Sequence, residues 1–130
     1  MTVAYKEIIY EVENGVATIT INRPDQLNAL TDLTQAEIRH ALEQAEINPD
    51  VVGTILTGAG RGFCSGVDMN ALGGMSEAGK RLGNNYEYLQ ADPGNPDNDP
   101  NYQSSPTYFL GLRKPLIAAI NGAAAGLGFS

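Results

Sequence analysis

The sequence has 130 residues, of which 42% are hydrophobic and 18% charged, which fits one folded domain with a modest core rather than a disordered chain. Its formal net charge is −7 and its eight lysines and arginines are scattered, so we expect no nucleic-acid partner, which would need a clustered basic face. No apolar run approaches the roughly 20 residues needed to cross a bilayer, so no membrane partner is expected either.

A β-hairpin is predicted at the start of the chain. Residues 8–12 and 16–21 are rich in β-branched side chains, and Asn14-Gly15 between them is a dipeptide that accepts positive φ in tight turns. The second run alternates between apolar residues and threonines, the period-2 pattern of a half-buried strand. Its apolar residues are Ala17, Ile19 and Ile21. Pro24 ends this strand because it cannot donate a hydrogen bond to a sheet.

An amphipathic helix is predicted after the hairpin. Thr34 and Glu37 have the spacing of a capping box, and apolar residues follow at helical intervals until Asn48-Pro49 ends the run. These apolar residues are Ile38, Ala41, Leu42 and Ala45. Residues 51–56 form a short apolar run without alternation, as expected of a strand covered on both faces. The order strand, helix, strand predicts a crossover unit in an α/β sheet.

The second half of the sequence contains a long loop and one more strand. Residues 91–107 are rich in Pro, Asn, Asp, Gly and Ser, so we expect a surface loop, either a pocket wall or a solvated insertion. Residues 108–113 are compatible with a helix, and residues 116–120 predict another buried strand. Residues 123–130 indicate a glycine turn that leads into an apolar helix. No helix-terminating signal follows, so we expect the sequence to be part of a longer chain.

The sequence has one cysteine, Cys64, and one histidine, His40. A single cysteine excludes an intrachain disulfide and a zinc site with several thiolates, and we expect no metal site. The N-terminus lacks the pattern of a secretion signal, so the chain is expected in the cytoplasm. His40 lies beside the apolar stripe of the helix and is interpreted as a surface residue. Without a nearby base, Cys64 is interpreted as a small buried thiol rather than a nucleophile.

The glycine-rich segment 58–66 follows a predicted strand, as a dinucleotide-binding turn would. A G-x-G-x-x-G pattern starting at Gly58 would need glycine at the position of Phe63, and no Gly-Lys-Ser/Thr follows. We therefore expect no nucleotide cofactor.

Two glycine turns, at residues 66–68 and 126–128, each follow a predicted buried strand and precede a predicted helix. This layout exposes free N–H groups at the positive end of a helix. Two such ends could share one oxygen and stabilise the negative charge that develops on it. From spacing alone, tight strand-to-helix turns without a catalytic role are an equally good interpretation.

Three motifs resemble the crotonase superfamily, the enoyl-CoA hydratase/isomerase group. They are ITINRP at 19–24 with NAL at 28–30, GFCSGVDM at 62–69, and KPLIAAINGAAAG at 114–126. The resemblance begins at about Ile8 and covers the N-terminal half of a typical member. It implies an α/β fold, the crotonase-like spiral of repeated ββα units, incomplete at the C-terminus. Residues 1–130 would then be the N-terminal portion of a single domain, with the C-terminal trimerisation helices absent from this sequence.

The resemblance also implies an acyl-coenzyme A substrate and a homotrimer or homohexamer. Coenzyme A would be part of the substrate, and no separate cofactor is expected. The residues after the two glycines, Val67 and Leu127, match the positions whose backbone N–H groups form the oxyanion hole, where Leu127 replaces the family's common glycine. Further matching positions imply contacts with the substrate. These are Arg23, Leu27, Ala29, Ser65, Gly66, Asp68, Met69 and Gly126.

Ser130 matches the position of the first catalytic glutamate of hydratases. A hydroxyl is not an unaided general base near neutral pH, so this residue does not support the usual two-glutamate hydration. The motifs predict an enzyme that stabilises a thioester enolate or a related oxyanion, and they leave the reaction open. The alternatives are a family member or fragment that binds acyl-CoA without chemistry, and an unrelated small α/β domain.

Overall fold

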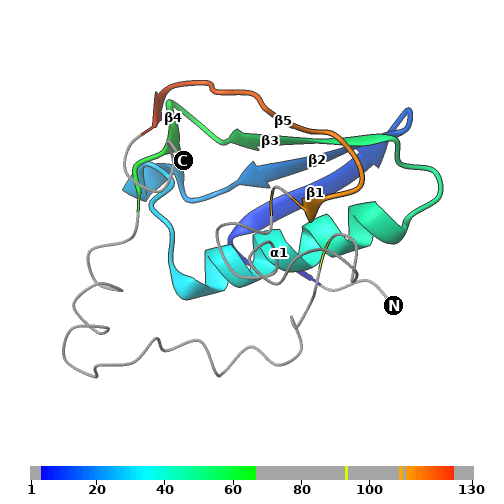
Figure 1. The fold of residues 1–130 in the computed structure, drawn as a ribbon. Helices are drawn as coiled ribbons and strands as arrows, with labels where there is room; N and C mark the ends of the chain where they lie inside the picture. Colours follow the sequence, from blue (N-terminus) through cyan, green and yellow to red (C-terminus); the bar gives the residue numbers. More distant parts are fainter. Residues whose placement is uncertain (1–3, 67–92, 94–108, 110, 125–130) are drawn as a thin grey trace.

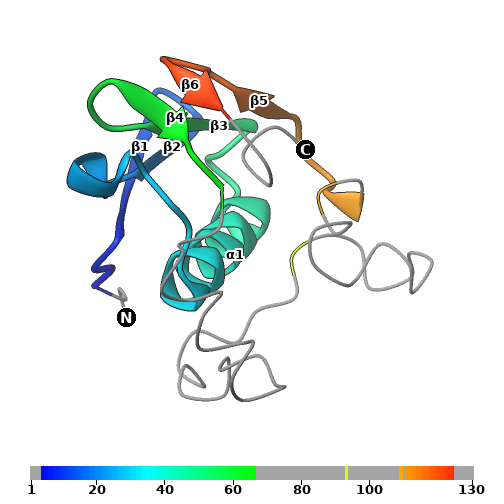
Figure 2. The ribbon, with the colours of Figure 1, turned by 90° about the vertical axis from the view of Figure 1, so that its left-hand side faces the viewer.

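The computed structural model describes residues 4–66, 93, 109 and 111–124 of the chain (Figure 1). Its elements are β1 (Ile8–Glu13), β2 (Val16–Ile21), the 3-10 helix η1 (Pro24–Gln26), α1 (Asp32–Ile47), β3 (Gly53–Gly58), β4 (Gly62–Cys64), β5 (Leu116–Ala118) and β6 (Ala123–Ala124). The main sheet has the strand order β1-β2-β3-β5, and a second sheet pairs β4 with β6. Helix α1 lies along one face of the main sheet, as the turned view in Figure 2 shows.

The predicted N-terminal hairpin is confirmed. β1 and β2 pair antiparallel along their full length and leave Asn14 and Gly15 as a two-residue turn. Their φ angles of 53° and 81° are the left-handed conformation that a tight hairpin turn requires. β3 pairs parallel with β2, so the predicted crossover through α1 is confirmed as well.

The core lies between the main sheet and α1. Alternate residues of β2 meet the apolar stripe of the helix, and full burial of one such aliphatic side chain contributes about 1.5–3 kcal/mol. The residues predicted for the two patterns are all buried, with exposed fractions of 5% or less: Ala17, Ile19, Ile21, Ile38, Ala41, Leu42 and Ala45. Both the period-2 and the helical pattern are therefore confirmed.

The start of α1 corrects the sequence prediction. The capping residue is Thr31, whose hydroxyl accepts a hydrogen bond from the Thr34 N–H at 3.1 Å, while the Thr34 hydroxyl accepts one from the Thr31 N–H at 3.2 Å. The expected capping box of Thr34 and Glu37 is wrong, because a second threonine three residues earlier provides the cap. The predicted end is confirmed, since Asn48 follows the last helical residue.

Glu37 is fully buried and binds the N-terminal segment instead of its own helix. Its two carboxylate oxygens accept hydrogen bonds from the backbone N–H groups of Lys6 and Glu7, both at 2.7 Å. A carboxylate that accepts backbone donors compensates part of its desolvation. Glu37 therefore fixes the chain just before β1 on the first turns of α1.

Two strand predictions need correction. The strand expected over 51–56 runs over Gly53–Gly58, and Val52 is 71% exposed. Residues 116–120 do contain a strand, β5, but Ile117 and Ile120 are 61% and 60% exposed. Ile117 pairs with Ile55 on the face of the sheet away from α1, and no described element covers that face.

Several expectations concern residues outside the described ranges. The loop 91–107 is described only at Pro93, which is buried. In the segment 108–113, the Leu112 N–H donates a hydrogen bond to the Phe109 carbonyl at 3.5 Å, three residues earlier, as in a 3-10 turn. Residues 108 and 110 are not described, so the predicted helix stays untested. In the described part of the chain, no helix combines the length and apolar character that spanning a membrane requires.

His40 is 8% exposed, so its interpretation as a surface residue is wrong. The N-terminal segment covers it, and the Tyr5 hydroxyl lies 2.7 Å from His40 Nδ1. The Tyr5 ring makes edge contacts with His40 at 5.7 Å and with Tyr10 at 6.3 Å between ring centres. These contacts form a small polar and aromatic cluster between the N-terminal segment, β1 and α1.

The raised pKa of the Tyr5 phenol predicts that the fold loses stability at alkaline pH. Burial raises its pKa to about 12, with smaller contributions from Tyr10 and Glu37. Because the folded pKa lies above the ordinary value of 10.0, the folded state keeps this stability below pH 10 and loses it as the pH rises toward 12. We expect Tyr5→Phe to reduce the loss, measured as the free energy of unfolding in urea at pH 9 and at pH 11. Parallel losses in the variant and the original chain would contradict this.

Candidate functional site

β4 and β6 lie side by side as a parallel pair (Figure 2). Gly66 comes two residues after β4 in the sequence, and Gly126 comes two residues after β6. A short strand that was not predicted lies between each predicted strand and its glycine turn. Because β4 and β6 are parallel, the chain runs in the same direction where it enters each of the two glycine turns.

Gly122 allows β6 to approach β4. A Cβ atom at this position would lie 1.9 Å from the Arg61 carbonyl oxygen and 3.2 Å from the Gly62 Cα. Both contacts are with backbone, which cannot rotate away as a flexible side chain would. Glycine is thus required here by the close approach of two backbone segments rather than by its φ angle.

Asn121, the preceding residue, connects the start of β6 to the turn between β3 and β4. Its Oδ1 accepts a hydrogen bond from the Gly58 N–H at 3.1 Å. Its Nδ2 donates to the carbonyl oxygens of Gly60 at 2.9 Å and Gly62 at 3.3 Å. One exposed amide side chain therefore satisfies a donor and two acceptors of this turn.

Asn28 also binds this turn and is fully buried. Its Nδ2 donates to the carbonyl oxygens of Ala59 at 2.9 Å and Gly62 at 2.6 Å, and its Oδ1 accepts from the Arg23 N–H at 2.8 Å. Its φ of 57° is in the left-handed region, which asparagine tolerates better than most residues. Both asparagines thus bind the Gly62 carbonyl, at the first residue of β4.

The loop 23–30 contacts the end of β4 directly. The Ser65 N–H donates to the Leu27 carbonyl at 3.2 Å, and the Leu30 N–H donates to the Gly66 carbonyl at 2.7 Å. Gly66 has a φ of 108°, which favours glycine. The structure therefore brings together five of the positions matched to substrate contacts. These are Arg23, Leu27, Ala29, Ser65 and Gly66.

The Arg23 guanidinium is engaged within the protein. Its Nε lies 3.2 Å from Glu7 Oε2, and its Nη1 donates to the Ala29 carbonyl. Glu7 also accepts hydrogen bonds from the Thr31 and Thr34 hydroxyls at the start of α1. Arg23 and Glu7 therefore connect the loop 23–30 to α1.

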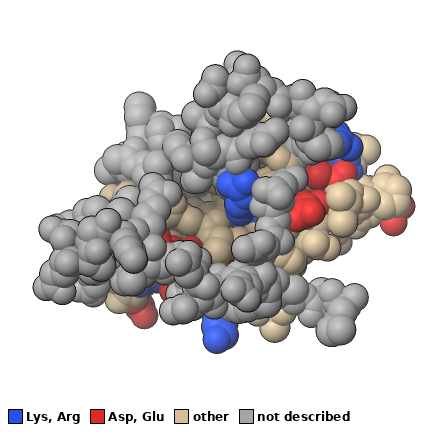
Figure 3. Space-filling model, turned by 60° about the horizontal axis from the view of Figure 1, so that its bottom comes forward, with Lys and Arg blue, Asp and Glu red and all other residues tan. Residues whose placement is uncertain are grey.

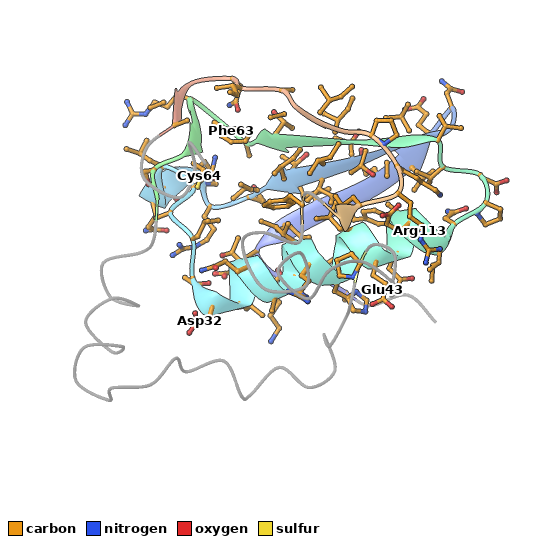
Figure 4. All side chains as sticks on the ribbon, in the orientation of Figure 1. Asp32, Glu43, Phe63, Cys64 and Arg113 are labelled. Carbon is orange, nitrogen blue, oxygen red and sulfur yellow. The ribbon has the colours of Figure 1, made fainter. Side chains whose placement is uncertain are left out.

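Cys64, the last residue of β4, is 1% exposed, which confirms its interpretation as a buried thiol. Burial raises the pKa of this thiol, and a backbone hydrogen bond to Gly66 lowers it by less. The neutral thiol is therefore favoured, whereas nucleophilic attack needs the thiolate. Figure 4 shows Phe63 and Cys64 at the end of the sheet opposite Arg113.

Six of the predicted site residues lie outside the described residues. They are Val67, Asp68, Met69, Gly126, Leu127 and Ser130. In the described ranges, no group of three or more His, Cys, Asp or Glu residues could hold a metal ion. On the face drawn in Figure 3, the described basic side chains lie apart from one another, with acidic side chains among them.

Four residues that organise this region were missed in the sequence. They are Glu7, Asn28, Asn121 and Gly122. The Nδ2 groups of the two asparagines donate to carbonyl oxygens 31 to 61 residues away, and Gly122 is needed for a contact with a distant backbone. No local pattern reports such contacts.

Comparison with known proteins gives one consistent result. The enoyl-CoA hydratase/isomerase family profile matches residues 11–130. A protein of Mycobacterium tuberculosis named "Probable enoyl-CoA hydratase" is 38% identical over 128 residues, which cover 97% of this chain and 43% of the relative. The 1,2-epoxyphenylacetyl-CoA isomerase of Escherichia coli is 35% identical over 127 residues, which cover 93% of this chain and 42% of that protein.

Solved structures agree with the sequence relatives. A crystal structure of an enoyl-CoA hydratase/isomerase from Mycobacterium paratuberculosis superposes with a TM-score of 0.65 at 35% identity. The match covers 96% of this chain and 41% of that structure. The predicted α/β crotonase-like fold is confirmed, and the chain spans about two fifths of the length of the relatives it matches.

Proposed function

This chain belongs to the enoyl-CoA hydratase/isomerase family, and on that premise we propose that it binds an acyl-coenzyme A and stabilises an oxyanion at the thioester carbonyl. The observation that carries the proposal is the parallel pairing of β4 and β6, the strands that precede the two glycine turns. In this proposal the backbone N–H groups of Val67 and Leu127 donate hydrogen bonds to the same oxygen.

The chemistry of a thioester explains why two such donors matter. Removing a proton beside the carbonyl, or adding a nucleophile to the conjugated double bond, moves negative charge onto the carbonyl oxygen. Fixed donors aimed at that oxygen stabilise the charge without reorganising, and the loss of one donor costs about 3 kcal/mol. Because these donors are backbone groups, Leu127 can serve in place of glycine.

The coenzyme A moiety would lie on the loop 23–30 and the residues that follow β4. The proposed contact positions are Arg23, Leu27, Ala29, Ser65, Gly66, Asp68, Met69 and Gly126. Support comes from the hydrogen bonds between this loop and Ser65 and Gly66, and from Leu27, which exposes 39% of its apolar side chain. The Arg23 guanidinium, which binds Glu7 and the Ala29 carbonyl, would orient the loop, so that backbone groups of the loop contact the ligand.

The reaction itself depends on acid and base groups. Ser130 stands where hydratases have their first catalytic glutamate, and it does not supply a general base. We therefore propose the shared oxyanion step rather than hydration. Since the chain spans about two fifths of its relatives, we further propose that residues 1–130 are the N-terminal portion of a crotonase-like domain. Trimeric or hexameric assembly in the cytoplasm is part of the same proposal.

Removal of one backbone donor tests the oxyanion step. Val67→Pro eliminates the N–H, whereas Val67→Ala keeps it, and proline is tolerated in the first turn of a helix. We expect Val67→Pro to abolish the shift to lower frequency of the thioester C=O stretch of bound hexadienoyl-CoA in difference Raman spectra, and to lower any turnover at least 100-fold. Val67→Ala should keep both.

The controls separate the possible functions. Calorimetric titration with hexadienoyl-CoA and with free coenzyme A measures binding independently of chemistry. A C=O shift without turnover of crotonyl-CoA would favour a non-catalytic acyl-CoA-binding protein. An original chain that binds neither ligand, or binds without a C=O shift, would refute the oxyanion proposal.

A further inference from the structure

Asn121 precedes β6 by two residues, and its side chain binds the end of β3 and the turn before β4. We infer that Asn121 is a positioning residue, which sets the spacing between the two donor turns through the turn at residues 58–62. This inference rests on the proposed function and deepens it, because it names the side chain on which the geometry of that site depends.

The first step is that the hydrogen bonds of the Asn121 side chain join the segment before β6 to the end of β3 and to the turn before β4. Asn121 precedes β6 by two residues, and its amide binds the Gly58 N–H and the carbonyl oxygens of Gly60 and Gly62. Gly62 is the first residue of β4. A displacement of the Asn121 amide is therefore transmitted to the relative position of β4 and β6.

The second step is that the pairing of β4 with β6 provides little restraint of its own. Among the described residues, Gly62 pairs with Ala123 and Cys64 with Ala124, and the register shifts between them. A two-stranded sheet such as this is at most marginally stable on its own. The four hydrogen bonds of the Asn121 side chain, one of them from the Thr57 hydroxyl at 3.5 Å, are thus an important restraint on the start of β6.

The third step concerns which element moves when Asn121 is changed. Asn28 also binds the Gly62 carbonyl, at 2.6 Å, and is itself buried, so the turn before β4 stays anchored. Asn121 is exposed and lies outside the hydrophobic core. Its loss should therefore release β6 relative to β4 and leave the main sheet and α1 folded.

Catalysis should respond more strongly than binding. Oxyanion donors act at 2.7–3.1 Å, and a misplacement of about 1 Å costs on the order of 100-fold in rate. The proposed coenzyme A contacts lie mainly on the loop 23–30 and the residues after β4. Backbone hydrogen bonds of Leu27 and Leu30 join these two segments without Asn121. We therefore expect a fall in kcat with little change in KM.

The test uses Asn121→Asp and Asn121→Ala in the full 130-residue chain. The aspartate keeps the shape and the acceptor for Gly58 but places an oxygen opposite the carbonyls of Gly60 and Gly62. We expect both variants to lose most of the C=O shift of bound hexadienoyl-CoA, to bind it within about threefold of the original affinity, and to exchange the Ala123 and Ala124 amide protons faster. Where crotonyl-CoA is turned over, kcat should fall about tenfold to 100-fold.

Asn14→Asp is the matched control, because it makes the same chemical change at an exposed turn far along the sheet. It should leave the C=O shift, binding and exchange unchanged. Asn121 variants that keep the original C=O shift would overturn the positioning role while the proposed function stands. An original chain without any C=O shift would overturn the proposed function and the positioning role together.

Discussion

Gly122→Ala is expected to destabilise the chain by about 2–3 kcal/mol and to break the pairing of β6 with β4. The new methyl group would lie 1.9 Å from the Arg61 carbonyl oxygen, far inside the distance that carbon and oxygen tolerate. Because Arg61 contributes backbone at this point, relief requires movement of the turn before β4 or of β6 itself. The measurement is the free energy of unfolding in urea, together with hydrogen exchange at Ala123 and Ala124.

Gly53→Ala is the control for this experiment. A methyl group at Gly53 would meet the Pro115 carbonyl at 3.5 Å and the Pro115 Cβ at 3.9 Å, which are ordinary contacts. It also restricts the unfolded chain, so its effect should stay within about 0.5 kcal/mol of zero or be slightly stabilising. Equal losses for Gly122→Ala and Gly53→Ala would show that the close approach at Gly122 does not limit stability.

The elements that could be predicted from the sequence are those specified by neighbouring residues. Asn14-Gly15 fixes the hairpin turn because both residues accept positive φ. The alternation around Ile19 and the helical spacing around Leu42 each report one buried face. The parallel crossover then follows from the order of strand, helix and strand.

The elements that could not be predicted depend on distant partners or on very short segments. The described residues of β4 and β6 number three and two, too few for any periodicity to appear. Thr31 and Thr34 are both plausible caps from local sequence. The choice of Thr31 fits the contacts of Glu37 with the N-terminal segment. The burial of His40 likewise depends on Tyr5, 35 residues earlier.

The candidate site likewise has a part that the sequence predicts and a part that it does not predict. The glycine turns and the positions after them are visible as motifs, because a tight turn needs glycine locally. The residues that hold the turn before β4 are not visible in this way, since the side-chain amides of Asn28 and Asn121 both donate hydrogen bonds to the Gly62 carbonyl from distant parts of the chain. A motif thus indicates the kind of site, whereas tertiary contacts determine its geometry.

Asn28→Asp is the second substitution for which we expect a large effect, a loss of about 3–5 kcal/mol at neutral pH. Asn28 is 0% exposed, and its Nδ2 donates to the carbonyl oxygens of Ala59 and Gly62. The substitution replaces this donor with an acceptor that faces two acceptors, and it buries a charge that only the Arg23 N–H can partly compensate. Each unsatisfied buried group costs about 1–3 kcal/mol, and a charged group costs more.

The loss from Asn28→Asp should depend on pH in a defined direction. Burial beside carbonyl oxygens favours the protonated carboxyl, so the pKa of the new group is raised in the folded state relative to the unfolded state. Such a group destabilises the fold progressively as the pH rises through that pKa. When protonated, it can again donate one hydrogen bond to Ala59 or Gly62. The difference from the original chain in free energy of unfolding should therefore be smaller at pH 4 than at pH 7.

Asn14→Asp provides the comparison, because Asn14 shares the left-handed conformation of Asn28, with φ angles of 53° and 57°, but is exposed. Any cost of placing aspartate in this backbone conformation is common to both variants. The excess loss for Asn28→Asp then measures the buried amide contacts between the loop 23–30 and the turn before β4. If the two variants lose the same free energy, those contacts do not stabilise the fold, and a different interaction must hold Ser65 and Gly66 against the loop.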